Sequence, residues 1–149
     1  RLLTSTTHFR NPHGLCVFDF FPVGGVVYIS MELKKGFVLR ERIKEAKLHP
    51  KKRLSETLIL QIVSAVVVVI LEGTATGWAH AGIQTGNIWL SPDHEVCLSE
   101  YGLNNLLSPE DLKSSAALLR TASYLAPEIY DAYQRPNFQT DQFALDSKT

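Results

Sequence analysis

The stretch WAHAGIQTGNIWL (residues 78–90) separates the longest apolar segment of the chain from an alternating pattern of apolar and polar residues. The apolar segment begins at Ser55, a residue type that caps helices, and continues as ETLILQIVSAVVVVILEGTATG. Its four consecutive valines favour a strand by propensity alone. The length of the segment, its serine head, and Gly73 and Gly77 at its tail favour a buried helix instead. We therefore predict a core helix, whose most apolar run, residues 62–71, covers about half the length that a bilayer requires.

The residues on either side of this stretch predict two hairpins and several short helices. NIWLSPDHEVCLSEYG (87–102) alternates around a Ser-Pro-Asp-His turn, and VFDFFPVGGVVYISMEL (17–33) reads as two strands broken at Pro-Val-Gly-Gly. FVLRERIKEA (37–46) has apolar residues at helical spacing. Shorter helices are expected within residues 108–120 and 126–134. The expected fold class is α+β, with an antiparallel strand pair ahead of a mainly helical body.

Composition describes one ordinary globular domain of 149 residues, with 45% hydrophobic and 20% charged residues. The formal net charge is zero, so we expect neither nucleic acid nor a membrane as partner. The basic cluster KLHPKKR (47–53) is short and contains no aromatic residue, and we interpret it as a solvated connection. Cys16 and Cys97 lie far apart without metal-ligand spacing, which predicts a reducing intracellular compartment, the cytoplasm. No signal peptide opens the chain, and its first residue, Arg1, indicates a fragment.

Five short motifs, none convincing alone, follow one another along the chain: VVYISMEL (26–33), HAGIQTGN (80–87), SEYG (99–102), TASYLAPE (121–128) and TDQFAL (140–145). Their order and spacing resemble a protein kinase domain. The resemblance covers residues 8 to 145, roughly, and is to the serine/threonine branch. Within it, the block from Ser55 to Leu90 is similar to NimA-related (NEK) kinases. The first two motifs resemble the last N-lobe strand with the hinge, and the catalytic loop. The other three resemble the metal-binding motif, the end of the activation segment and the central C-lobe helix.

The resemblance implies a partial kinase-like fold in which residues 1–33 are an N-lobe remnant and hinge, and residues 34–149 an incomplete C-lobe. Met31 would be the gatekeeper, and Glu32 and Leu33 would begin the hinge, whose backbone groups bind adenine in the family. The glycine-rich phosphate loop, the strand lysine and its partner glutamate are not found in the sequence. We also expect the central helix to be truncated, which would expose apolar faces of the core helix and make the isolated chain fold marginally.

The loop at residues 80–87 lacks the side chains that phosphoryl transfer uses. Gly82 stands where the resemblance places the catalytic aspartate, and glycine cannot accept the proton of a substrate hydroxyl. Such general-base catalysis is typically worth about 10² to 10⁴ in rate. Ala81 replaces the arginine that braces a phosphorylated activation loop, and Gln84 replaces the lysine that neutralises the transferring phosphate. His80 keeps its position and is expected to have a structural role.

Two residues retain an altered form of the family's metal site. Asn87 stands where the second metal ligand is expected, and Glu100 replaces the aspartate of Asp-Phe-Gly with a stem one carbon longer. Magnesium requires near-octahedral geometry at about 2.0–2.1 Å, so the longer side chain is a handicap. The resemblance implies ATP and Mg²⁺ as cofactors, and these replacements predict that both bind weakly.

The remaining site residues come from the last two motifs. Thr121, Ala126, Pro127 and Glu128 correspond to the end of the activation segment, where Thr121 is a candidate phosphoacceptor. Asp141 would fix the backbone of the catalytic loop by accepting hydrogen bonds from its amides.

Three functions agree with this sequence. The first is a pseudokinase that acts by binding or scaffolding a protein partner. The second is a serine/threonine kinase that binds ATP and keeps weak residual activity within a longer parent chain. The third is a non-functional gene fragment.

Overall fold

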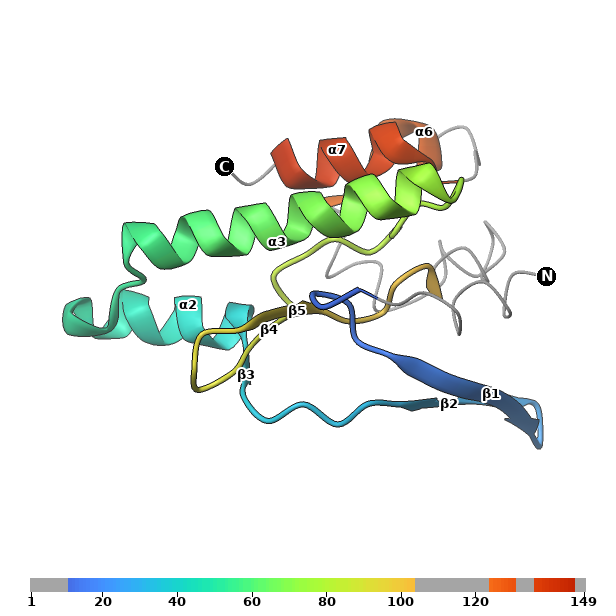
Figure 1. Ribbon diagram of the computed structural model, residues 1–149, viewed down its shortest axis with the longest axis horizontal. Helices are drawn as coiled ribbons and strands as arrows, with labels where there is room; N and C mark the ends of the chain where they lie inside the picture. The colour runs from blue at the N-terminus through green and yellow to red at the C-terminus, as the bar shows by residue number, and fades with distance from the viewer. Residues whose placement is uncertain (1–10, 104–123, 131–135, 147–149) are drawn as a thin grey trace.

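The computed structural model describes residues 11–103, 124–130 and 136–146, which form an α+β fold, as predicted (Figure 1). Helix α3 lies between α7 on one side and a three-stranded sheet on the other, while a two-stranded hairpin extends away from this body. The elements, in chain order, are β1 (Val17–Val23), β2 (Val26–Met31), β3 (Phe37–Val38), α2 (Leu39–Leu48), the 3₁₀ helix η1 (Pro50–Lys52), α3 (Glu56–Ala75), β4 (Ile88–Leu90), β5 (Val96–Leu98), α6 (Pro127–Tyr130) and α7 (Phe138–Asp146).

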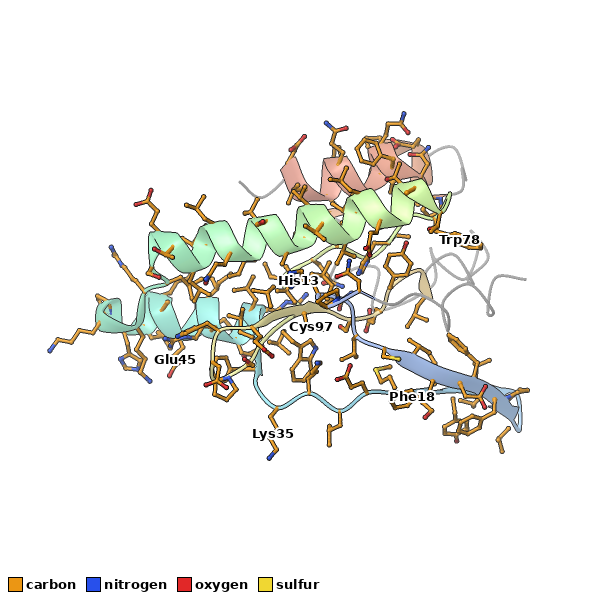
Figure 2. All side chains as sticks on the ribbon, viewed as in Figure 1. His13, Phe18, Lys35, Glu45, Trp78 and Cys97 are labelled. Atoms are coloured by element: carbon orange, nitrogen blue, oxygen red, sulfur yellow. The ribbon has the colours of Figure 1, made fainter. Side chains whose placement is uncertain are left out.

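The first hairpin consists of the antiparallel strands β1 and β2. Val23 pairs with Val26, and the turn between them has Gly24 at φ 57° and Gly25 at φ 82°. Glycine adopts positive φ without steric cost, so this pair permits the tight turn that the sequence predicted. Most side chains of the hairpin are exposed, among them Phe18, which is labelled in Figure 2.

The three-stranded sheet has the order β3-β4-β5, with both pairs antiparallel. The pairing of β4 with β5 confirms the second predicted hairpin. The prediction of a helix from residue 37 was wrong at its start, because Phe37 and Val38 pair with Leu90 and Trp89, and α2 begins only at Leu39. The preceding Gly36 has φ 145°, and a Cβ there would lie 2.1 Å from the Leu90 carbonyl oxygen. Only glycine allows the chain to pass this close to β4.

Helix α3 forms the centre of the core. The Ser55 hydroxyl oxygen accepts a hydrogen bond from the Leu58 amide at 3.2 Å, which satisfies one of the free donors at the helix start. The apolar segment is therefore a helix, as predicted, and its four valines do not form a strand. One stripe at helical spacing is buried against β5 and α7: Leu58, Ile62, Ala65, Val66, Val69, Ile70 and Gly73.

The opposite side of α3 is also apolar. By length and composition this helix could cross a membrane, because an 18-residue window has a mean hydropathy of 2.3, and 39% of that window is buried. The sequence interpretation counted only residues 62–71 and so underestimated the apolar length. The core helix of a globular domain meets the same criteria, and α3 has the packed stripe of such a helix. Its exposed apolar residues are Ile59, Leu60, Val63, Val68 and Leu71.

Candidate functional site

The candidate site is built on the loop between α3 and β4. Helix α3 ends where Gly77, at φ 76°, reverses the chain and the Trp78 amide donates to the Gly73 carbonyl at 2.8 Å. Trp78 lies at this end of the helix (Figure 2). The loop then enters the core, where most of its residues are buried: Ala79, His80, Ala81, Ile83 and Asn87.

Asp141, on α7, holds the start of this loop. Its two carboxylate oxygens accept hydrogen bonds from the backbone amides of His80, at 2.6 Å, and Ala81, at 2.8 Å. Ala81 has φ 61°, a left-handed conformation that is costly for a residue with a Cβ. Burial raises the pKa of Asp141 to about 6, while the two amide hydrogen bonds favour its charged form. Helix α7 thus fixes a strained turn sixty residues earlier in the chain.

His80 is a buried residue of the loop and connects the loop to the segment after β5. Its carbonyl accepts a hydrogen bond from the Gly102 amide at 2.9 Å, and its ring packs edge-on against Tyr101, with centroids 5.4 Å apart. Burial lowers the pKa of His80 to about 4, so the imidazole is neutral at pH 7. A buried neutral ring facing an aromatic side chain is suited to packing.

The structure brings the two candidate metal ligands into direct contact. The Asn87 side-chain amide donates to the Glu100 carboxylate at 2.8 Å and to the Gly82 carbonyl at 2.8 Å. Glu100 is exposed and has φ 64°, so the backbone turns sharply at this residue. Among the residues that the structure describes, no group of three or more His, Cys, Asp or Glu side chains could hold a metal ion. The carboxylate and amide oxygens of this pair are the candidate ligands for a hard cation.

Gln84 has a partner that sequence reasoning missed. Its side-chain oxygen accepts a hydrogen bond from Arg40 Nη2, and the Arg40 backbone amide donates to the Thr85 carbonyl at 2.9 Å. Arg40 lies in the first turn of α2, where its charge looks like that of any solvated helix residue. No local signal could have found this contact, because it joins residues 44 positions apart.

A cavity of about 330 Å³ lies beside the loop. Met31, Glu32 and Leu33, which the sequence analysis predicted as gatekeeper and hinge, line one part of it, but the Glu32 amide already donates to the Cys16 carbonyl at 2.8 Å. Lys34 also lines it and pairs with Glu32 at 2.8 Å, whereas Lys35 points away from the body (Figure 2). The remaining lining residues are Leu15, Gly86, Trp89, Ser99 and Glu100.

The last two motifs contribute unequally to the described site. Thr121 and the predicted helix at 108–120 lie outside the described residues. Ala126 is buried, and Pro127 and Glu128 begin α6. One contact between this region and the loop joins the hydroxyl groups of Tyr124 and Thr85 at 3.4 Å.

Comparisons with known proteins point to one class of relative. The chain is 28% identical over 134 residues to the probable serine/threonine-protein kinase pknA2 of Bifidobacterium longum, covering 90% of this chain and 17% of that protein. It is 27% identical over 132 residues to CBL-interacting protein kinase 4 of Oryza sativa, covering 87% of this chain and 28% of that protein. It is 30% identical over 118 residues to the serine/threonine-protein kinase PknL of Mycobacterium tuberculosis, covering 76% of this chain and 27% of that protein.

No family model matches the chain. It spans between 17% and 28% of the length of the three relatives named above. The similarity to serine/threonine kinases over most of this chain supports a protein-kinase-like domain with a partial kinase-like fold.

Proposed function

We propose that this kinase-like domain does not transfer phosphate and acts by binding a protein partner. The observation that carries the proposal is Gly82, which stands where the resemblance places the catalytic base. The Gly82 carbonyl accepts a hydrogen bond from Asn87, which orders the loop without supplying a base. A loop that is held in place but whose proton-accepting side chain, His80, is buried is suited to recognition.

The charges of the site support the same proposal. Gln84 carries no charge, and its side-chain oxygen faces the Arg40 guanidinium. Lys34, which lines the cavity, is paired with the Glu32 carboxylate. Phosphoryl transfer requires positive charge where negative charge develops. The cation of the described lining, Lys34, is already neutralised by Glu32, so this lining supplies little positive charge to a transferring phosphate.

A serine/threonine kinase with weak residual activity is the second candidate. The observation that favours it is the 2.8 Å hydrogen bond from the Asn87 side-chain amide to the carboxylate of Glu100, because Glu100 lines the cavity beside the predicted hinge. A Mg²⁺ ion bound here would supply charge for phosphoryl transfer, with the Glu100 carboxylate and the Asn87 side-chain oxygen as its protein ligands. The names of the relatives agree with this candidate. A NEK-like subfamily stays a proposal, resting on the block from Ser55 to Leu90.

The two candidates are separated by a phosphate-transfer assay and a thermal-shift assay on the same preparation of the full chain. We expect no transfer from radiolabelled ATP to a serine- and threonine-containing protein substrate, and no Mg²⁺-dependent rise in Tm with ATP. A double variant, Asn87→Ala with Glu100→Ala, is the control for contaminating kinases. Transfer by the unchanged chain that disappears in the double variant would establish the kinase and sink the proposal. Transfer that persists in the double variant comes from a contaminant.

We propose a cytoplasmic location and a protein partner, without nucleic acid or membrane binding. Two free, widely separated cysteines support the cytoplasmic location. Zero formal net charge supports the absence of nucleic acid and membrane binding. The packed stripe of α3 supports the assignment of this helix to the core. Fractionation of cells expressing the full chain tests this assignment. Recovery in the membrane pellet after a high-salt wash would contradict a core role for α3.

A further inference from the structure

The Arg40 guanidinium lies against the backbone of the degenerate loop. A Cβ added at Gly86 would lie 2.5 Å from Arg40 Nη2 and 2.8 Å from Arg40 Cζ, so the guanidinium occupies the space that a side chain at position 86 would need. Gly86 also lines the cavity beside the hinge. The positive charge of Arg40 therefore lies at the edge of the site, although it comes from helix α2.

This guanidinium has no acidic partner among the residues that the structure describes. Its one side-chain hydrogen bond in the described structure goes to the neutral Gln84. The acids of α2 pair elsewhere, since Glu41 contacts Lys44 while Glu45 contacts other cations of α2 and η1. A guanidinium has five N–H donors in a fixed fork. Most of the donor capacity of Arg40 is therefore unused by the described structure.

The segment that begins with the first turn of α2 and continues through η1 carries an excess of positive charge along its length. Residues 39–53 contain seven basic and two acidic side chains, a formal excess of five charges in a chain whose net charge is zero. The segment contains no Phe, Tyr or Trp, so it lacks the stacking side chains typical of single-stranded nucleic acid sites. This excess of basic residues without aromatic ones favours a partner that is recognised through its own acidic side chains.

We infer that Arg40, the loop at residues 84–86 and the adjoining basic surface of α2 and η1 bind an acidic segment of a partner polypeptide. Arg40 would receive a carboxylate or phosphate group of that segment in a two-pronged hydrogen bond, and the surrounding cations would attract the rest of it. The inference rests on the proposed function, because it names the chemistry of the protein partner.

Binding is measured by fluorescence anisotropy with two labelled peptides, one rich in glutamate and a matched one rich in glutamine. We expect the glutamate peptide to bind the full chain at least about tenfold more tightly, with an affinity that falls as salt rises. A chain that binds both peptides equally contradicts the inference.

Three variants locate the binding. Arg40→Gln removes the charge but keeps a hydrogen-bond donor, and should weaken binding of the glutamate peptide by about tenfold. Gln84→Glu keeps Arg40 but places a carboxylate beside its guanidinium, where this carboxylate competes with the peptide. This variant should therefore weaken peptide binding to a similar extent, while the contact between residues 40 and 84 is kept. Lys35→Gln removes one positive charge from a side chain that points away, and should change the affinity by less than about twofold.

Equal losses in Arg40→Gln and Lys35→Gln would mean that net charge alone attracts the peptide, and would overturn the inference. Full competition by a single-stranded oligonucleotide or by ATP at equal concentration would assign the surface to a different ligand and also overturn it. The phosphate-transfer assay is independent of these results. Phosphate transfer that needs Asn87 and Glu100 would contradict the proposed function. Failure of the glutamate peptide to bind would contradict only the inference that the partner segment is acidic.

Discussion

The two sides of the loop at residues 79–87 have opposite characters. On the inner side, His80 and Asp141 are buried, and hydrogen bonds tie the loop to α7 and to the segment after β5. On the outer side, Gly82 and Gln84 are half-buried and lack the acid and the cation that the resemblance expects. The inner side meets the requirements of folding, because buried polar groups must be paired, while the outer side is free to lose catalytic groups.

Under the proposed function, this difference explains how the chain keeps the backbone of the loop without catalytic side chains. Removing a partner from a buried hydrogen bond costs about 1–3 kcal/mol, which is a sizeable part of the stability of a small domain. Replacing a half-exposed side chain on the surface typically changes stability by less than about 0.5 kcal/mol. Removing a hydrogen-bond partner on the inner side should therefore destabilise the domain measurably, whereas substitutions on the outer side should leave its stability nearly unchanged.

The largest expected effect tests the inner side at Gly73. A Cβ at this position would lie 2.3 Å from the Tyr101 hydroxyl oxygen and 2.7 Å from the Trp78 carbonyl oxygen. Gly73→Ala should therefore lower the free energy of unfolding by about 3 kcal/mol, as overpacking of a core does. The matched control is Gly77→Ala, where no atom lies within 4 Å of the new Cβ and only the positive φ of 76° is penalised, at about 1 kcal/mol.

Urea unfolding followed by circular dichroism measures both glycine variants. Equal losses at the two positions would mean that Gly73 is needed for backbone freedom and that Tyr101 does not pack closely beneath it.

The next effect concerns the opposite pH dependences of His80 and Asp141. The folded-state pKa of His80, about 4, is below its usual 6.5, so the unfolded state binds more protons between these values and stability rises with pH. The folded-state pKa of Asp141, about 6, is above its usual 3.8, so the folded state binds more protons and stability falls as pH rises. In the unchanged chain the two contributions largely cancel between pH 4 and pH 6.

Single variants should separate these contributions. As the pH rises from 4 to 6, the free energy of unfolding of Asp141→Asn should rise by about 2 kcal/mol, because only the contribution of His80 remains. Over the same range that of His80→Phe should fall by a similar amount, because only the contribution of Asp141 remains. Chemical unfolding at several pH values measures both slopes, independently of the loss that each substitution causes by itself. Slopes of the same sign in the two variants would show that other groups dominate the titration.

Parts of the fold could be predicted because their signals are local. Gly24 and Gly25 mark the first hairpin, and Ser55 marks the start of α3. The strand at Phe37 could not be predicted, because its pairing partner is Leu90, more than fifty residues away.

The candidate site follows the same division. The resemblance grouped Asn87 with Glu100, which lie in direct contact. It gave no indication of Arg40, because a side chain that reaches a loop from another helix leaves no pattern in its own segment.

The smallest effect tests the strain where the two sides of the loop meet. Ala81 has φ 61°, a conformation that glycine adopts freely and that costs an L-residue about 1–2 kcal/mol. Ala81→Gly also loses a buried methyl group and gains unfolded-state entropy, so we expect the free energy of unfolding to change by less than about 0.5 kcal/mol. The matched control is Ala79→Gly, which loses a similarly buried methyl group at a residue without positive φ and should lower stability by about 1 kcal/mol. Urea unfolding measures both, and a loss at position 81 as large as that at 79 would show that the hydrogen bonds of Asp141 hold Ala81 without strain.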